Sequence, residues 1–142
     1  MKLDLTPLEK GLGQLEQSLS YLRSDIALRD PGLRAQFRAA AIQAFEYTYE
    51  LAVKMIRRQL AQISAVPSEL AELSYRDLIR EAADAGLVLD PESFFLYRDI
   101  RNITAHTYDE AKAERVLGVL DGFRKDVLAL VKELKRRNHA RD

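Results

Sequence analysis

Apolar residues recur along this chain at alternating spacings of three and four, which is the period of one face of an α-helix. A first stripe consists of Leu8, Leu12, Leu15, Leu19, Leu22 and Ile26. A second consists of Ile42, Phe45, Tyr49, Ala52, Ile56, Leu60 and Ile63. A third consists of Val116, Leu120, Phe123, Val127, Leu130 and Leu134. The three stripes predict three long helices, each with an apolar face that needs a neighbour.

Capping signals predict where the first two of these helices begin and end. Thr6-Pro7-Leu8-Glu9 offers an N-cap at Thr6, a proline at the first helical position, and a glutamate that completes a capping box. Asp30-Pro31-Gly32 then ends the first helix and starts the second, which we expect to run from near Pro31 to Ile63.

Similar signals divide the rest of the chain. Beyond a looser segment that contains Pro67, Ser74 is placed to cap a short helix that closes at Gly86. Asp90, followed by proline, opens a fourth helix, and the segment that begins at Thr107 caps a last long one.

Long amphipathic helices joined by short connections favour antiparallel neighbours. No segment alternates with period two between hairpin turns, and no internal repeat is visible. We therefore predict an all-α fold, an up-and-down helical bundle of four to five helices, with residues 1–142 forming a single helical domain.

Composition narrows the class of protein. The 142 residues are 47% hydrophobic and 31% charged, which is typical of a globular protein. The chain has no cysteine, which excludes disulfides, thiol catalysis and thiolate-bound zinc. Charges interrupt every apolar stretch, and the N-terminus lacks the layout of a signal peptide. We expect a cytoplasmic protein without a membrane partner.

The charge balance argues against a protein that grips a long run of nucleic-acid backbone. Twenty-two basic residues face 22 acidic ones, whereas such binding requires the neutralisation of many phosphates. A small phosphate site remains compatible with this balance. The cations near the C-terminus are more typical of a helix end, where the dipole favours positive charge, than of a binding patch: Lys132, Lys135, Arg136, Arg137 and Arg141.

Several kinds of site are poorly supported. The two histidines are far apart and neither lies in a His-Glu-x-x-His motif, so we expect no metal and no cofactor. Glu46 and Glu50 lie one helical turn apart, which suits a solvated face better than a cation site. No serine lies in a strand-turn-helix elbow typical of a nucleophile.

The segment from Arg101 to Tyr108 is the strongest candidate for chemistry. It holds His106, and histidine is the side chain whose ordinary pKa lies nearest neutral pH. On a continuous helix Asn102 and His106 share a face, while Arg101 lies about 140° from His106. A helix that ends near Thr104, or a two-fold axis between subunits, would bring the arginine and the histidine together.

Such a pair can cleave RNA without a metal. The guanidinium is a fork of donors for phosphate oxygens, and the imidazole can exchange a proton with the ribose 2′-hydroxyl or the leaving oxygen. A structural interpretation is the alternative: Arg101 pairs with an acid such as Asp99, His106 caps the helix end, and the Tyr108 ring packs on the core. Composition and spacing alone favour this alternative.

Three segments in order, residues 42–54, 74–82 and 101–110, resemble the HEPN family of small helical proteins. The chain is most similar to the branch of nucleotidyltransferase substrate-binding proteins, and the likeness spans nearly its whole length. The family motif Arg-x4-His-x-Tyr falls on Arg101, His106 and Tyr108, with the usual asparagine at Asn102.

The resemblance implies a ribonuclease toxin, paired with a minimal nucleotidyltransferase as antitoxin. Arg101 and His106 would form the RNA-cleaving site across a homodimer, and Tyr108 would be the residue that the partner adenylates. A bulky anion there would block RNA and repel its phosphates. Relatives often carry tryptophan where this chain has Val53, a change of packing more than of chemistry. A non-catalytic module that presents substrate to the nucleotidyltransferase is the alternative function.

Overall fold

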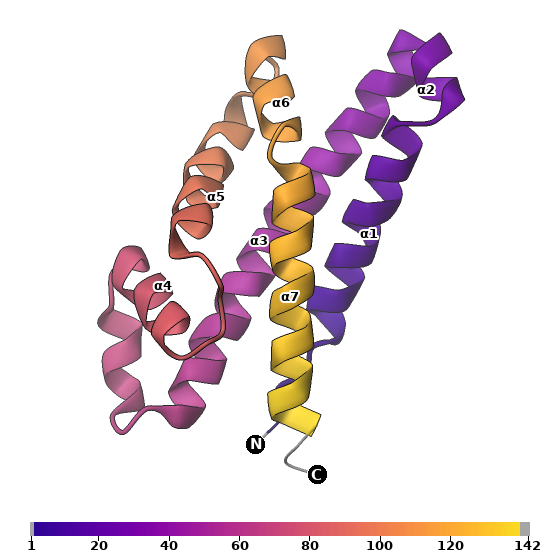
Figure 1. Cartoon of the computed structure of the whole chain (residues 1–142). Helices are drawn as coiled ribbons and strands as arrows, with labels where there is room; N and C mark the ends of the chain where they lie inside the picture. Colours follow the sequence, from indigo (N-terminus) through magenta and orange to yellow (C-terminus); the bar gives the residue numbers. More distant parts are fainter. Residues whose placement is uncertain (1, 140–142) are drawn as a thin grey trace.

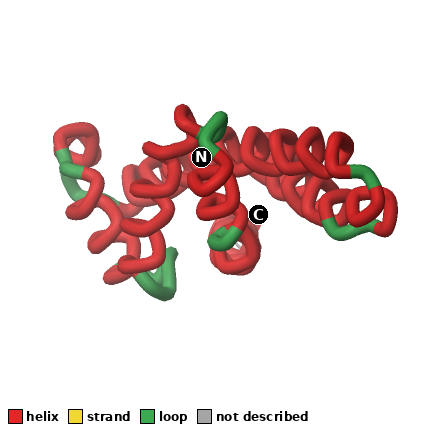
Figure 2. Tube along the Cα trace, turned by 90° about the horizontal axis from the view of Figure 1, so that it is seen from above, coloured by secondary structure: helices red, strands yellow, loops and turns green. Residues whose placement is uncertain are grey.

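Helices make up all of the regular structure in residues 2–139, the part of the chain that the computed structural model describes. Within this range Figures 1 and 2 show helices and loops and no strand. The α-helices are α1 Thr6–Leu22, α2 Asp25–Arg29, α3 Pro31–Ile63, α4 Tyr75–Asp84, α5 Pro91–Ile103, α6 Glu110–Leu117 and α7 Leu120–His139. Two 3-10 helices join them, η1 Pro67–Glu72 and η2 Thr104–His106.

The long helix α3 runs through the whole molecule, and the other helices pack along it (Figure 1). One side carries α1 and α2, the other side carries η1, α4 and α5, and α7 lies between them. The chain passes up through α1, down α3, up α5 and down α6 and α7. The prediction of an all-α up-and-down bundle is therefore confirmed.

The three apolar stripes meet in one continuous core. Phe45 from the second stripe packs edge-on against Phe123 from the third, with ring centroids 4.8 Å apart, and both are fully buried. Leu15 from the first stripe is buried as deeply. The last residue of two stripes departs from the pattern, because Ile26 and Ile63 are 55% and 57% exposed.

The predicted ends of the first helix were partly wrong. The helix begins at Thr6, so the Thr6 side chain does not cap it, and the Thr6 N–H instead donates to Asp4 at 3.1 Å. It ends at Leu22 instead of continuing to Asp30. The cause is Ser24, whose hydroxyl accepts from the Ala27 N–H and so starts the separate helix α2.

The last long helix is also two helices. Asp109, and not Thr107, caps α6 by accepting from the N–H groups of residues 111 and 112. Gly118, a poor helix former, then closes α6 before α7 begins. The caps predicted at Asp30, Ser74 and Asp90 are confirmed, as are the bounds of α3.

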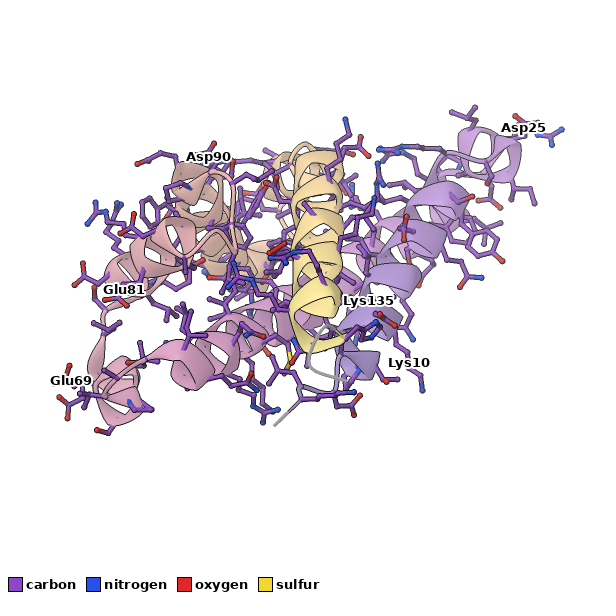
Figure 3. All side chains as sticks on the ribbon, turned by 60° about the horizontal axis from the view of Figure 1, so that its bottom comes forward. Lys10, Asp25, Glu69, Glu81, Asp90 and Lys135 are labelled. Atoms are coloured by element: carbon purple, nitrogen blue, oxygen red, sulfur yellow. The ribbon has the colours of Figure 1, made fainter. Side chains whose placement is uncertain are left out.

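The described ends of the chain are tied together at the foot of α7. The buried Asn138 side chain accepts from the Leu3 N–H at 3.0 Å and donates to Gln59 at 2.9 Å. Figure 3 shows Lys135 beside the start of α1, where its ammonium pairs with Glu9 at 2.6 Å. None of the helices described in residues 2–139 is long and apolar enough to cross a bilayer.

Candidate functional site

The end of α5 and the turn that follows it hold the predicted site residues. Arg101 lies in the last turn of α5, His106 ends η2, and Tyr108 lies in the loop before α6. The helix ends at Ile103, one residue before the position at which the sequence suggested that the arginine and the histidine could approach. All three side chains therefore lie within one short, mostly exposed stretch.

Arg101 is held by two elements at once. Its Nη2 donates to Glu50 Oε1 on α3 at 2.7 Å and lies 3.9 Å from Glu46 Oε2. Its Nη1 donates to the Thr104 hydroxyl oxygen at 3.0 Å. The side chain is 31% exposed, so the guanidinium is fixed in place and still borders solvent. Arg101 thus pairs with an acid, as the structural alternative predicted, but the acid is Glu50 and not Asp99.

Thr104 organises the turn beneath the arginine. Its buried hydroxyl donates to the Arg101 carbonyl oxygen at 2.7 Å while it accepts from the Arg101 guanidinium. The Thr107 hydroxyl donates to the Thr104 carbonyl oxygen at 3.2 Å. Sequence reasoning missed Thr104 and the role of Glu50. A threonine at the end of a helix is a weak sequence signal for the role of Thr104. No local signal marks the role of Glu50.

His106 and Tyr108 form an exposed aromatic pair. Their ring centroids lie 6.1 Å apart at an interplanar angle of 78°, an edge-to-face contact. Tyr108 is 84% exposed, so the alternative in which its ring packs on the core is wrong. No side-chain hydrogen bond engages the imidazole within the described chain, and His106 is exposed.

Arg101 and His106 are near in sequence but do not hydrogen-bond to each other. No hydrogen bond among the described residues joins His106 to Arg101 or to Asn102. Asn102 is exposed and lines a separate pocket between α4 and α5. Within the described residues, the imidazole therefore has no hydrogen-bonding partner in this segment.

The aromatic residues of the second stripe belong to the core, as their helical spacing predicted. Phe45 is fully buried, and Tyr49 is 7% exposed. Burial raises the pKa of the Tyr49 hydroxyl, and the nearby Arg98 and Arg101 guanidinium groups oppose that rise.

The described residues contain no group of three or more histidine or acidic side chains that could hold a metal ion. The groups that the site does offer are a fixed guanidinium and an exposed imidazole. A guanidinium binds phosphate through parallel hydrogen bonds, and an imidazole transfers protons near neutral pH. The arrangement is suited to chemistry at a phosphodiester.

Residues 3–136 match the family model described as "Nucleotidyltransferase substrate binding protein like". The chain belongs to this family. A relative from Haemophilus influenzae, named "Probable ribonuclease HepT", is 36% identical over 139 residues, which cover 96% of this chain and 95% of the relative. The match therefore extends over nearly the whole of both proteins.

Solved structures show the same family fold. A Haemophilus influenzae structure, described as revealing the fold of a substrate-binding domain of a nucleotidyltransferase, superposes with a TM-score of 0.88 at 34% identity. It covers 93% of this chain and 99% of its own. A Thermus thermophilus protein superposes with a TM-score of 0.68 at 28% identity and covers 90% and 98%. The resemblance seen in the sequence is thereby confirmed at the level of the family.

Proposed function

We propose that this protein is a metal-independent ribonuclease toxin that a partner nucleotidyltransferase neutralises. The observation that carries the proposal is the Arg101 guanidinium, fixed by Glu50 and Thr104 on the same exposed segment as the free imidazole of His106. The relative named as a probable ribonuclease, which matches over nearly the full chain, supports it.

The chemistry requires one base and one acid. An imidazole removes the proton from a ribose 2′-hydroxyl, and the 2′-oxygen attacks the adjacent phosphorus. The bond to the 5′-oxygen breaks, and that oxygen takes a proton from an imidazolium. The products are a 2′,3′-cyclic phosphate and a 5′-hydroxyl. Arg101 binds the phosphate oxygens and stabilises the charge that develops on them.

Each chain has a single histidine in this segment, so we place the active site across a homodimer. A two-fold axis near the end of α5 would set two His106 side chains and two Arg101 side chains around one phosphodiester. One imidazole then acts as the base and the other as the acid. Arg101 and His106 do not hydrogen-bond to each other within the described chain, which is consistent with a site that is completed by a second copy.

Tyr108 offers the partner a means of control. Its hydroxyl is the most accessible nucleophilic group beside the imidazole, because the ring is 84% exposed and contacts His106. Adenylation by the minimal nucleotidyltransferase would place a phosphate and a nucleoside over the site and exclude RNA. Expression alone and beside the partner, followed by intact mass, tests this role: an added adenylate must disappear in Tyr108→Phe.

Cleavage by purified variants tests the ribonuclease itself. We expect Arg101→Ala and His106→Ala each to abolish cleavage of cellular RNA and any inhibition of growth, because each removes a group that acts on the phosphate. Both residues are partly or fully exposed, so circular dichroism should show an unchanged helical fold. Undiminished cleavage by both variants would remove the proposal.

A second candidate is a non-catalytic module that presents substrate to a nucleotidyltransferase. The solved structure described as a nucleotidyltransferase substrate-binding domain favours it. In that case the purified wild-type protein never cleaves RNA, yet raises the activity of its partner, and Arg101→Ala lowers that stimulation. The two candidates therefore differ in what the wild-type protein does alone.

A further inference from the structure

A pocket of about 200 Å³ lies between α4 and α5, one turn from the candidate site. Tyr75 and Arg76 line it from the start of α4. The α5 residues that line it are Phe95, Arg98, Asp99 and Asn102. Its lining thus combines two guanidinium groups, one carboxylate, one amide and two aromatic rings.

The two arginines lie over aromatic rings. The Arg76 guanidinium lies 4.4 Å from the centre of the Phe95 ring, and the Arg98 guanidinium lies 4.9 Å from the centre of the Tyr75 ring. The Tyr75 hydroxyl donates to the Phe94 carbonyl oxygen at 3.0 Å, which fixes that ring. A cation–π contact attracts a guanidinium to a ring without using its N–H donors, which remain available to a ligand.

These two arginines also differ from most others in the molecule. Arg23, Arg34 and Arg38 are each paired with a carboxylate at 2.6–2.9 Å. Within residues 2–139 neither Arg76 nor Arg98 forms an ion pair, although Asp99 lines the same pocket. The pocket therefore keeps a net positive charge that the fold has not neutralised.

The pocket adjoins the candidate site along α5. Arg98 lines the pocket, and Arg101 lies three residues further on, on the same side of the helix. Asn102 lines the pocket and follows Arg101 directly. A strand of RNA whose phosphate sits at Arg101 would pass this pocket with a neighbouring nucleotide.

We propose that the α4–α5 pocket is a second phosphate subsite, in which Arg76 and Arg98 bind the backbone of RNA beside the cleaved nucleotide. The inference rests on the proposed ribonuclease function and extends it. It supplies what a protein of zero net charge needs in order to bind RNA, a local cluster of unpaired cations.

The test is binding of an RNA that cannot be cut. The probe is a mixed-sequence 2′-O-methyl oligoribonucleotide, and anisotropy gives its affinity at several salt concentrations. We expect the double variant Arg76→Gln, Arg98→Gln to bind about tenfold more weakly at moderate salt and its salt slope to fall by about 1.4, two contacts at about 0.7 each. Asp99→Asn should strengthen binding, since it removes the one negative charge of the pocket.

The matched control is the double variant Arg29→Gln, Arg136→Gln. It removes the same net charge from exposed positions on α2 and α7, both outside the pocket lining (Figure 1). Binding that falls equally in both double variants would mean a general charge effect and would overturn the subsite. Unchanged binding of the probe in the Arg76 and Arg98 variant would overturn the subsite as well. So would a variant that binds the probe normally and loses only the binding of free ATP, measured in parallel.

A separate cleavage assay distinguishes failure of the subsite from failure of the ribonuclease. Binding that depends on Arg76 and Arg98 in a protein that never cuts RNA supports the subsite and removes the nuclease. Cleavage that depends on Arg101 but not on Arg76 and Arg98, with unchanged probe binding, supports the nuclease and removes the subsite.

Discussion

The last turns of α5 and α7 both carry arginine, and the surroundings of these arginines differ. Arg101 lies in the last turn of α5, and Arg136 and Arg137 lie in the last turn of α7, where the helix dipole favours a cation. At the end of α7, Glu133 binds both arginines. At the end of α5, the guanidinium is oriented by Thr104 and Glu50 beside an exposed imidazole.

The density of charge along a sequence does not show which cations are free to bind a phosphate. The C-terminal run looks more basic than any other segment, yet three of its cations are paired with carboxylates. Arg136 and Arg137 do lie in the last turn of α7, as predicted, and Arg141 lies outside the described residues. The single arginine at the end of α5 is the one for which we propose a catalytic role.

The largest difference between the two helix ends should appear when the shape of the cation changes and its charge does not. We expect Arg101→Lys to lower kcat/KM for RNA by at least about 100-fold, because lysine lacks the fork that binds two phosphate oxygens. Arg136→Lys should leave cleavage unchanged. Cleavage rates of both purified variants measure this, and equal losses would erase the distinction.

Thr104 should have the next largest effect. Thr104→Val keeps the shape of the side chain but leaves the Arg101 carbonyl and guanidinium without their buried partner. We expect a loss of about 1–2 kcal/mol in the free energy of unfolding and a roughly tenfold fall in kcat/KM. Urea titration and cleavage rates measure the two effects.

Thr107→Val is the matched control for that experiment. The Thr107 hydroxyl makes one longer bond, at 3.2 Å, and does not touch Arg101. We expect Thr107→Val to change kcat/KM by less than about threefold, because the loss of one partly exposed hydrogen bond has a small effect. If Thr107→Val were as damaging as Thr104→Val, the turn as a whole would matter and not the contact to the arginine.

Arg137 should affect stability and leave activity unchanged. Its Nη2 donates to the Ala85 carbonyl oxygen, which joins α7 to the end of α4, and its Nε donates to Glu133 at 3.0 Å. We expect Arg137→Gln to lower the free energy of unfolding by about 1 kcal/mol, because the carbonyl loses its partner. Cleavage by the same preparation should match the wild type; a fall larger than the change in folded fraction would contradict this.

The smallest effect concerns pH. Hydrogen bonds from Arg136 and then Arg137 lower the pKa of the Glu133 carboxyl from 4.5 to about 2. A lowered pKa stabilises the fold fully above pH 4.5, and the contribution fades as the pH falls from 4.5 toward 2. The thermal midpoint of the wild type should therefore exceed that of Glu133→Gln at pH 7, and the gap should close by pH 2. A gap independent of pH would contradict it.

Most of the fold was predictable because it rests on local periodicity. The three stripes placed the core, and the caps at Asp30, Ser74 and Asp90 were recognised from the side chains themselves. The errors came where a local signal competed with another. Ser24 caps the separate helix α2, and Asp109 takes the capping position expected for Thr107, so α1 stops early and α6 starts late.

The site was predictable in its residues and not in its partners. Arg101, His106 and Tyr108 were recognised as a motif, and the exposed ring of Tyr108 suits the role that the resemblance implies. Glu50 and Glu46 were assigned to a solvated face, because their contact with Arg101 spans about 50 residues of sequence. The pocket of Arg76 and Arg98 was not predicted for the same reason, since it forms only where α4 meets α5.

The amino-acid sequence by itself determined the helices and the face that each one buries, and it marked the segment that we propose as the site, because these depend on residues within a few turns of one another. The pairing of Arg136 and Arg137 with Glu133 is equally local, since all three lie on α7. Only the tertiary structure decided which cations meet carboxylates on other helices, as Arg101 meets Glu50. Electrostatic interactions are set by distance in space and by burial, not by order along the chain.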